Sequence, residues 1–269
     1  MNHHLNIAFT TEADPLRSFD AYIPSFPSQA ILVFVHGGAW RAGDKADYKN
    51  LAAKLVEASG CAVLVPNYRL TPASPSAGNK FEHPGHAEDI LTFLTFLANW
   101  EGLAGLENIS KLPVHAIGHS AGAHILASIF LDSSAVTPTL TPSAAVTQLV
   151  RGIVLSEGIY DIDLLLKSFP SYCDWFIAAA FGQHESYIDG SVSRLALRPG
   201  LEHLRWLVGH SSGDTLVDVV QSETMRDHLQ ALYGQSQVTS SFDAVAVEHD
   251  DVLLDPVFIE LVAKFVGSA

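Results

Sequence analysis

The feature that most constrains the fold is a regular alternation between short apolar runs and longer segments with helical periodicity. Continuous apolar runs bounded by turn residues are typical of strands that are buried on both faces of a sheet. Apolar residues three and four positions apart indicate helices between them. The pattern predicts an α/β fold, with a mainly parallel sheet and helices on both faces. We expect strands at 18–24, 30–36, 61–68, 113–118, 150–158, 204–210 and 242–248, and helices at 47–60, 86–100, 121–132, 219–234 and 255–268.

Two segments interrupt this alternation. Residues 133–149 are rich in Ser, Thr, Pro and Ala and predict a loop with no clear element. Residues 161–200 predict a short helical cap over the carboxyl ends of the strands, where α/β sheets bind ligands. We expect a single domain over 1–269, because no internal repeat or linker divides the chain. The cap segment carries the aromatic residues Tyr172, Trp175, Phe176, Phe181 and Tyr187.

A serine stands between two glycines in GHSAGAH (118–124), after an expected strand and before an expected helix. Gly118 and Gly122 leave room for a tight turn where a side chain would clash. An ordinary glycine-rich turn is the alternative, but the strand–turn–helix context favours G-x-S-x-G, the elbow that exposes a nucleophile. The sequence therefore predicts Ser120 as a nucleophile.

A serine hydroxyl attacks efficiently only when a base accepts its proton and a third group orients that base. In folds that carry this elbow, the acid and then the histidine follow the serine along the chain. Asp214 and His249 each come soon after an expected strand, at the edge where Ser120 emerges. Asp218 is a rival acid that lies further from its strand, and the carboxylates at 250–251 adjoin His249 too closely to orient it. We expect Ser120, Asp214 and His249 to form a catalytic triad.

An oxyanion hole is also needed, because negative charge develops on the attacked carbonyl oxygen. HGGAW (36–40) follows an expected strand and offers two successive glycines, Gly37 and Gly38, whose N–H groups can approach a ligand closely. The N–H group of Ala121, the residue after the nucleophile, would complete the hole.

Composition excludes several classes of function. The net charge of −14 disfavours binding to phosphate backbones and anionic membranes, so we expect neither a nucleic-acid nor a membrane partner. Two cysteines without pair spacing, no visible signal peptide and no apolar run of membrane-spanning length are typical of a cytoplasmic protein. No nucleotide-binding glycine motif is present, and we expect no cofactor. Oligomeric state is open, a homodimer included.

Several motifs together carry a resemblance to a known family: HGGAWRAGDK (36–45), NYRL (67–70), GHSAGAH (118–124) and SEGIYDI (156–162), with Asp214 and His249. With them the chain resembles the hormone-sensitive-lipase-like branch of the α/β-hydrolases, and within it kynurenine formamidases (arylformamidases). The resemblance covers residues 18 to about 262 and is weakest at 133–150 and across the cap. Ala39 departs from many lipase-like relatives, in which a third glycine is common.

This resemblance implies an α/β-hydrolase fold and a small-molecule substrate, N-formyl-L-kynurenine, cleaved to formate and L-kynurenine in tryptophan catabolism. Trp40, Trp175 and Phe176 are the expected substrate contacts, and Arg41, Lys45 or Arg69 could supply a cation for the substrate carboxylate. A carboxylesterase for short acyl esters is the alternative enzyme. A non-catalytic ligand receptor on the same fold is the alternative outside enzymes.

HPGHAED (83–89) presents His83, His86 and Asp89, three residue types that can bind a metal. Pro84 and Gly85 prevent a regular helix between the two histidines, and no third His or Cys is near in sequence. We therefore expect no metal.

Overall fold

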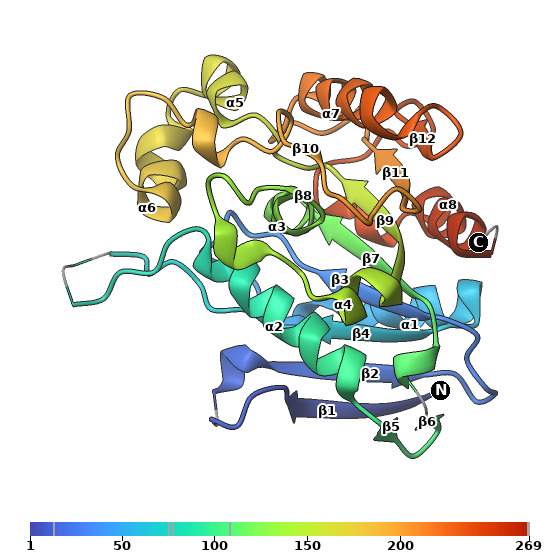
Figure 1. Cartoon of the computed structure of the whole chain (residues 1–269). Helices are drawn as coiled ribbons and strands as arrows, with labels where there is room; N and C mark the ends of the chain where they lie inside the picture. Colours follow the sequence, from blue (N-terminus) through green and yellow to red (C-terminus); the bar gives the residue numbers. More distant parts are fainter. Residues whose placement is uncertain (13, 75, 77, 108, 268–269) are drawn as a thin grey trace.

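The structure is a computed structural model that describes residues 1–269 apart from residues 13, 75, 77, 108, 268 and 269. Its centre is an eight-stranded sheet with the strand order β1-β2-β4-β3-β7-β9-β11-β12 (Figure 1). The pairings of β1 with β2 and of β2 with β4 are antiparallel, and the other neighbours pair in parallel. The strands are β1 (Asn2–Ala8), β2 (Ser18–Ile23), β3 (Ile31–Val35), β4 (Ala62–Pro66), β7 (Val114–His119), β9 (Val150–Ser156), β11 (Arg205–Gly209) and β12 (Val238–Ser241).

Helices cover both faces of this sheet (Figure 1). Alternate residues of β3 explain why: Val33 joins the core on one face, whereas Leu32 and Phe34 join the core on the other. One face packs against α1 (Lys49–Ser59) and α8 (Pro256–Gly267), and the other against α2 (Gly85–Asn99), α3 (Ala121–Phe130), α4 (Ala144–Leu149) and α7 (Val219–Tyr233). The predicted mainly parallel α/β fold is confirmed. No helix among the described residues is long and apolar enough to cross a membrane.

The prediction of a strand at 242–248 is wrong. The strand that pairs with β11 is β12, at Val238–Ser241. The backbone of Val247 instead bonds to one side chain of the loop after β11, because the Ser211 hydroxyl donates to the Val247 carbonyl at 2.5 Å and accepts from its N–H at 2.8 Å. The alternating pattern therefore belongs to a loop that is pinned by a serine rather than by a neighbouring strand.

Helix α4 and strand β1 are two further elements that the sequence did not predict. The expected loop at 133–149 is wrong at its end, where α4 begins after Ser143, whose hydroxyl accepts from the Val146 N–H at 3.4 Å. Strand β1 was not predicted, because its exposed edge position leaves it polar. The last position of the helix expected at 255–268 lies outside the described residues.

Residues 161–200 hold short elements beside the sheet. Figure 1 shows α5 and α6 together above one end of the strands. Nε2 of His124, in α3, lies 2.7 Å from the carbonyl oxygen of Gly190, and Arg198 donates to the carbonyl of Leu131 at 2.7 Å. These contacts attach the segment to the domain. Its elements are α5 (Ile162–Ser168), a π-helical turn (Cys173–Ile177), α6 (Ala178–Phe181) and β10 (Ala196–Leu197), which pairs with β8 (Leu131–Asp132); a separate hairpin pairs β5 (Gly102–Leu103) with β6 (Leu106–Glu107).

Candidate active site

Ser120 occupies a strained turn between β7 and α3. Its φ of 54° and ψ of −120° lie outside the regions that non-glycine residues prefer. The turn is held because the Ser120 N–H donates to the carbonyl of Ser156, at the end of β9, at 2.9 Å. A Cβ atom on Gly118 would lie 2.5 Å from the Gly122 carbonyl oxygen, and one on Gly122 would lie 2.1 Å from the Val35 carbonyl oxygen. Both glycines are therefore required by the close approach of backbone to backbone.

The two glycines after β3 lie next to this turn. A Cβ atom on Gly37 would come within 2.9 Å of the Ser120 Cβ, and Gly38 has a φ of 94° that favours glycine. Ala39 and Trp40 continue the unusual backbone, with φ values of 51° and 59°. The sequence HGGAW thus forms a tight loop that presents its backbone to the side chain of Ser120.

Asp214 and His249 are in direct contact. Nδ1 of His249 lies 2.6 Å from Oδ2 of Asp214, and the two side chains are 7% and 0% exposed. Burial alone would raise the pKa of Asp214. The hydrogen bond with His249, the charge of that ring and the N–H groups of Val217 and Leu216 outweigh burial and lower this pKa to about 2. Asp214 is therefore a carboxylate at neutral pH, and its position fixes the orientation of the His249 ring.

The other carboxylates considered as rivals have different partners. Asp218 precedes α7 and accepts a hydrogen bond from the Ser168 hydroxyl. Asp250 lies 3.2 Å from Nε2 of His119, whose ring centroid is 4.7 Å from that of His249. Burial lowers the pKa of His119 to about 4 despite the opposing effect of Asp250, so His119 is neutral. Neither rival contacts His249 in the way that Asp214 does.

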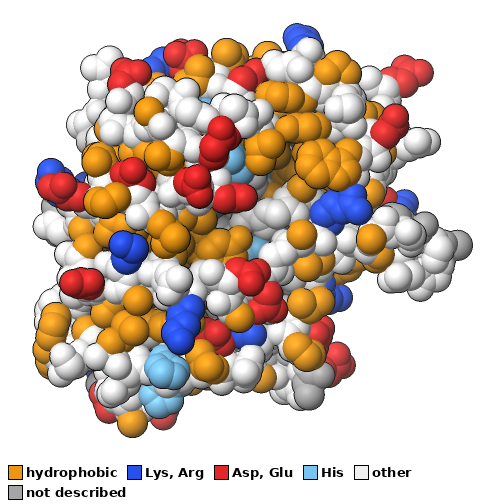
Figure 2. Space-filling model, turned by 180° about the vertical axis from the view of Figure 1, so that it is seen from behind, with side chains coloured by type: hydrophobic (Ala, Val, Ile, Leu, Met, Phe, Trp, Pro, Cys, Tyr) orange, Lys and Arg blue, Asp and Glu red, His pale blue; other side chains and the backbone are white. Residues whose placement is uncertain are grey.

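Ser120 and His249 line one cavity of about 390 Å³. Figure 2 shows a hollowed area on one face of the molecule, with hydrophobic, basic, acidic and histidine side chains around it. Among the described residues, no hydrogen bond joins the Ser120 hydroxyl to His249. Hydrogen bonds between a nucleophile and its base often become short only when substrate binds. The other lining residues are Gly38, Ala39, Arg41, Ala42, Ile159, Tyr172, Trp175, Phe176, Leu216, Val217 and Asp250.

The expected substrate contacts divide into two groups. Trp175 and Phe176, two of the expected substrate contacts, line the cavity. Of the residues expected in the oxyanion hole, Gly38 lines the cavity, whereas Gly37 and Ala121 are not among its lining residues. Trp40 was expected to contact substrate, and the structure places it elsewhere. Its side chain is fully buried and packs edge-on against His124 and Phe181, with ring centroids 5.1 and 4.8 Å apart. Trp40 therefore supports the cap from below instead of lining the cavity.

Of the three cations considered for a substrate carboxylate, Arg41 alone is among the described lining residues. Lys45 is buried, with its Nζ 3.9 Å from Oδ1 of Asp20. Nη2 of Arg69 lies 2.7 Å from Oδ1 of Asp89, in a salt bridge. The Arg41 guanidinium donates to the backbone carbonyl of Trp175, which joins the loop after β3 to the cap.

Sequence reasoning missed several lining residues. Tyr172 belongs to the aromatic cap segment and could have been proposed with its neighbours. Ile159, Leu216 and Val217 carry no such signal, since short apolar residues in loops are indistinguishable from packing residues. Asp250 was treated as a loop carboxylate, although its place next to His249 brings it to the cavity.

Two of the three residues named for a metal site, His86 and Asp89, are engaged by other side chains. Nε2 of His86 is 2.9 Å from the Thr71 hydroxyl, and Asp89 is bound by Arg69. Two other groups place three ligand-type atoms within 4.8 Å of one another: His119, His249 and Asp250, and Glu157, Asp214 and His249. Both include His249, which already contacts Asp214, and we assign neither group to a metal.

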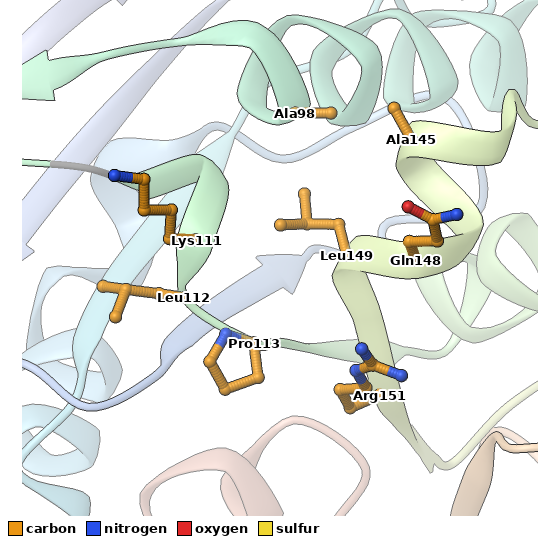
Figure 3. Close-up of a pocket in the computed structure, with 8 residues that line it drawn as sticks. All are labelled: Ala98, Lys111, Leu112, Pro113, Ala145, Gln148, Leu149 and Arg151. Atoms are coloured by element: carbon orange, nitrogen blue, oxygen red, sulfur yellow. The ribbon is translucent and has the colours of Figure 1, made fainter.

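A second cavity of about 530 Å³ lies at the opposite ends of β7 and β9 from Ser120. Figure 3 shows Lys111, Gln148 and Arg151 around it, together with apolar side chains. No serine, cysteine or histidine is among its lining residues, so it offers no nucleophile or base.

The fold and the serine, histidine and aspartate side chains define a class. The family model described as alpha/beta hydrolase fold matches residues 32–181, and the chain belongs to this family. It is an enzyme, a hydrolase. Within the family it is most like kynurenine formamidases.

Curated relatives carry this likeness. The chain is 30% identical over 214 residues to a kynurenine formamidase of Eremothecium gossypii, covering 74% of this chain and 79% of the relative. It is 28% identical over 224 residues to one of Meyerozyma guilliermondii, covering 81% and 78%. Among solved structures, an esterase B from Lactobacillus rhamnosis superposes with a TM-score of 0.76 at 17% identity, covering 99% of this chain and 85% of that one. At that identity the likeness concerns the fold alone.

Proposed function

We propose that the chain hydrolyses N-formyl-L-kynurenine to formate and L-kynurenine, a step of tryptophan catabolism. The observation that carries this proposal is a cavity beside Ser120 that combines an aromatic wall with a guanidinium group. It occurs in a chain that is similar to kynurenine formamidases over most of its length.

The reaction has two halves, acylation and deacylation of Ser120, and the triad acts in both. The Ser120 hydroxyl attacks the formyl carbonyl while Nε2 of His249 accepts its proton, because Nδ1 of that ring donates to Asp214. The Asp214 carboxylate stabilises the imidazolium that forms. His249 then protonates the departing arylamine, the C–N bond breaks, and a formyl ester of Ser120 remains. Water, deprotonated by His249, attacks this ester, and the protonated His249 returns the proton to the Ser120 oxygen as the C–O bond breaks and formate leaves.

Backbone N–H groups stabilise the oxyanion in both halves of this reaction. Gly38 lines the cavity, and Ala121 begins α3 directly after the nucleophile. Gly37 packs against the Ser120 side chain and keeps the loop close to it. We assign the donor N–H groups to Gly38 and Ala121, and the N–H of Ala39, the next lining residue, is the candidate for a third.

The cavity suits each part of this substrate. The flat arylamine ring packs against Tyr172, Trp175 and Phe176. The amino-acid carboxylate binds the Arg41 guanidinium, and its ammonium group faces Asp250. The formyl group is the smallest acyl group and fits beside the tight backbone of Gly38.

The test compares acyl groups on the same enzyme. We expect kcat/KM to be highest for N-formylkynurenine and to fall from p-nitrophenyl acetate through butyrate to hexanoate, because longer chains overlap the formyl pocket. A roomy pocket would instead gain about 0.8 kcal/mol for each buried CH₂ group. Strong butyrate hydrolysis with negligible formamide turnover would leave a carboxylesterase on the same triad. No turnover of any acyl substrate would favour a ligand receptor.

A further inference from the structure

Glu157 is a buried ionisable residue in the segment SEGIYDI that the proposed reaction leaves unused. It directly follows β9, next to Ser156, whose carbonyl holds the Ser120 turn. Its side chain is 1% exposed, and its φ of 51° lies in the left-handed region that glycine tolerates best. An ionisable side chain kept both buried and strained indicates that its carboxyl group has a role.

The Glu157 carboxyl group faces the two loops that carry Asp214 and His249. Both of its oxygens accept from the N–H of Ser211, at 2.9 and 3.1 Å, and Oε2 lies 3.3 Å from Nδ1 of His210. Asp214 is the charged group whose contact raises the pKa of Glu157. One oxygen of each carboxyl group and a ring nitrogen of His249 lie within 4.8 Å of one another.

Among the described residues, the surroundings do not supply enough positive charge for two carboxylates. The charge that acts on Glu157 is that of Asp214, and the charge that acts on Asp214 is that of His249. His210 is neutral because burial lowers its pKa, and the Ser222 hydroxyl of α7 lies 3.0 Å from its Nδ1. Other titratable neighbours are Tyr160, a neutral phenol near Glu157, and Asp218, which acts on His210. Asp214 also acts on His119, Tyr172 and Asp250.

Two buried carboxyl groups in contact hold one proton between them. Asp214 is the better anion, because it accepts from Leu216 at 2.8 Å, from Val217 at 3.0 Å and from His249. Glu157 accepts from a single N–H group, that of Ser211. The proton therefore belongs on Glu157.

We infer that Glu157 is a carboxylic acid at neutral pH and donates its proton in a hydrogen bond to the Asp214 carboxylate, as a positioning residue behind the triad. The pair then carries a single negative charge, which matches the single positive charge of the His249 imidazolium. The inference rests on the proposed roles of Asp214 and His249. It adds a fourth side chain to Ser120, His249 and Asp214.

This arrangement has a consequence at alkaline pH. Burial raises the pKa of Glu157 to about 9, and the contact with Asp214 adds to this rise. The hydrogen bond from the Ser211 N–H opposes the rise but does not cancel it. Above that pH the proton is lost and two buried carboxylates repel each other beside His249. The orientation of Asp214 is then disturbed, and kcat/KM declines.

The substitution Glu157→Gln separates the proton from the packing, because the amide keeps the size and a donor but cannot ionise. In the wild-type protein, infrared difference spectra should show the carbonyl band of a protonated carboxylic acid at pH 7, lost as the pH rises through about 9. Glu157→Gln should remove this band. Glu202→Gln, the same change at an exposed glutamate, is the matched control and should leave the band in place.

Activity gives the second readout, with p-nitrophenyl acetate as substrate. Glu157→Gln should keep kcat at pH 7 and lose the alkaline decline near pH 9, whereas Glu157→Ala should lower kcat by about 10- to 100-fold, the range for a lost hydrogen bond to a charged group. The infrared spectra need no substrate, so they test the Glu157 proton even if the proposed substrate is wrong. A wild-type protein without the band at pH 7, or the same alkaline decline in Glu157→Gln, would overturn the inference.

Discussion

Nδ1 of His249 lies 2.6 Å from Oδ2 of Asp214, although 35 positions separate the two residues along the chain. Each stands in a loop that follows one of the last two strands of the sheet, and both side chains are buried. Because the contact fixes which ring nitrogen carries the proton, it leaves Nε2 free to act as the base.

The first prediction tests this contact. Asp214→Asn should lower kcat by roughly 10⁴-fold with little change in folding, because an amide stabilises the wrong tautomer of the histidine. Steady-state kinetics with p-nitrophenyl acetate measure the effect. Asp218→Asn, the same change at the rival carboxylate, is the control and should retain wild-type kcat. Equal losses in both variants would mean that Asp214 has no special role.

Arg41 provides a test of substrate recognition. Arg41→Gln should raise KM for N-formylkynurenine by about 10- to 100-fold, the range for a lost charge-assisted hydrogen bond, while kcat/KM for p-nitrophenyl acetate stays unchanged. The ester has no carboxylate for the guanidinium to bind. Arg194→Gln, at an exposed arginine of the cap that pairs with Asp161, is the control. Similar losses on both substrates would assign Arg41 a structural role through its contact with Trp175.

Buried histidines predict a loss of stability in acid. Burial lowers the pKa values of His36, His115, His119 and His124 to about 4. An unfolded histidine protonates near pH 6.5, so between about 6.5 and 4 the unfolded state binds more protons and the free energy of unfolding falls with falling pH. Each such group contributes on the order of 3 kcal/mol across this window.

Urea unfolding at several pH values measures this effect. His115 lies in β7 away from the cavity, and His115→Leu should reduce the dependence of unfolding free energy on pH. His3→Leu, at an exposed position, is the matched control and should leave that dependence unchanged. A wild-type protein equally stable at pH 7 and pH 4.5 would contradict the prediction.

Much of the fold could be predicted from the sequence because buried helices and strands show a periodic pattern of apolar residues. β3 is apolar along its length since helices cover both faces of the sheet, and Ser120 stands at the junction of a strand and a helix. Asp214 could be proposed because it comes soon after β11, at the edge where the carboxyl ends of parallel strands meet. His249 does not directly follow a strand in the structure, and the chain order of serine, acid and histidine is the signal that identified it.

The remainder depends on contacts between distant segments. The run at 242–248 alternates like a strand, but Ser211 takes the hydrogen bonds of Val247. Trp40 has a large aromatic side chain of the kind that often contacts a substrate. Its burial becomes visible only in the structure, where Phe181 and His124 pack against it. No periodicity marks contacts of this kind.

The account as a whole is tested most directly by the turnover of N-formylkynurenine in wild-type protein and Ser120→Ala side by side, with release of kynurenine followed by absorbance. Ser134→Ala, the same change at an exposed serine, controls for the substitution itself. We predict that wild-type and Ser134→Ala hydrolyse the formamide equally and that Ser120→Ala, folded by circular dichroism, loses roughly 10⁴-fold or more in kcat. Turnover of N-formylkynurenine by Ser120→Ala at the wild-type rate would contradict the account.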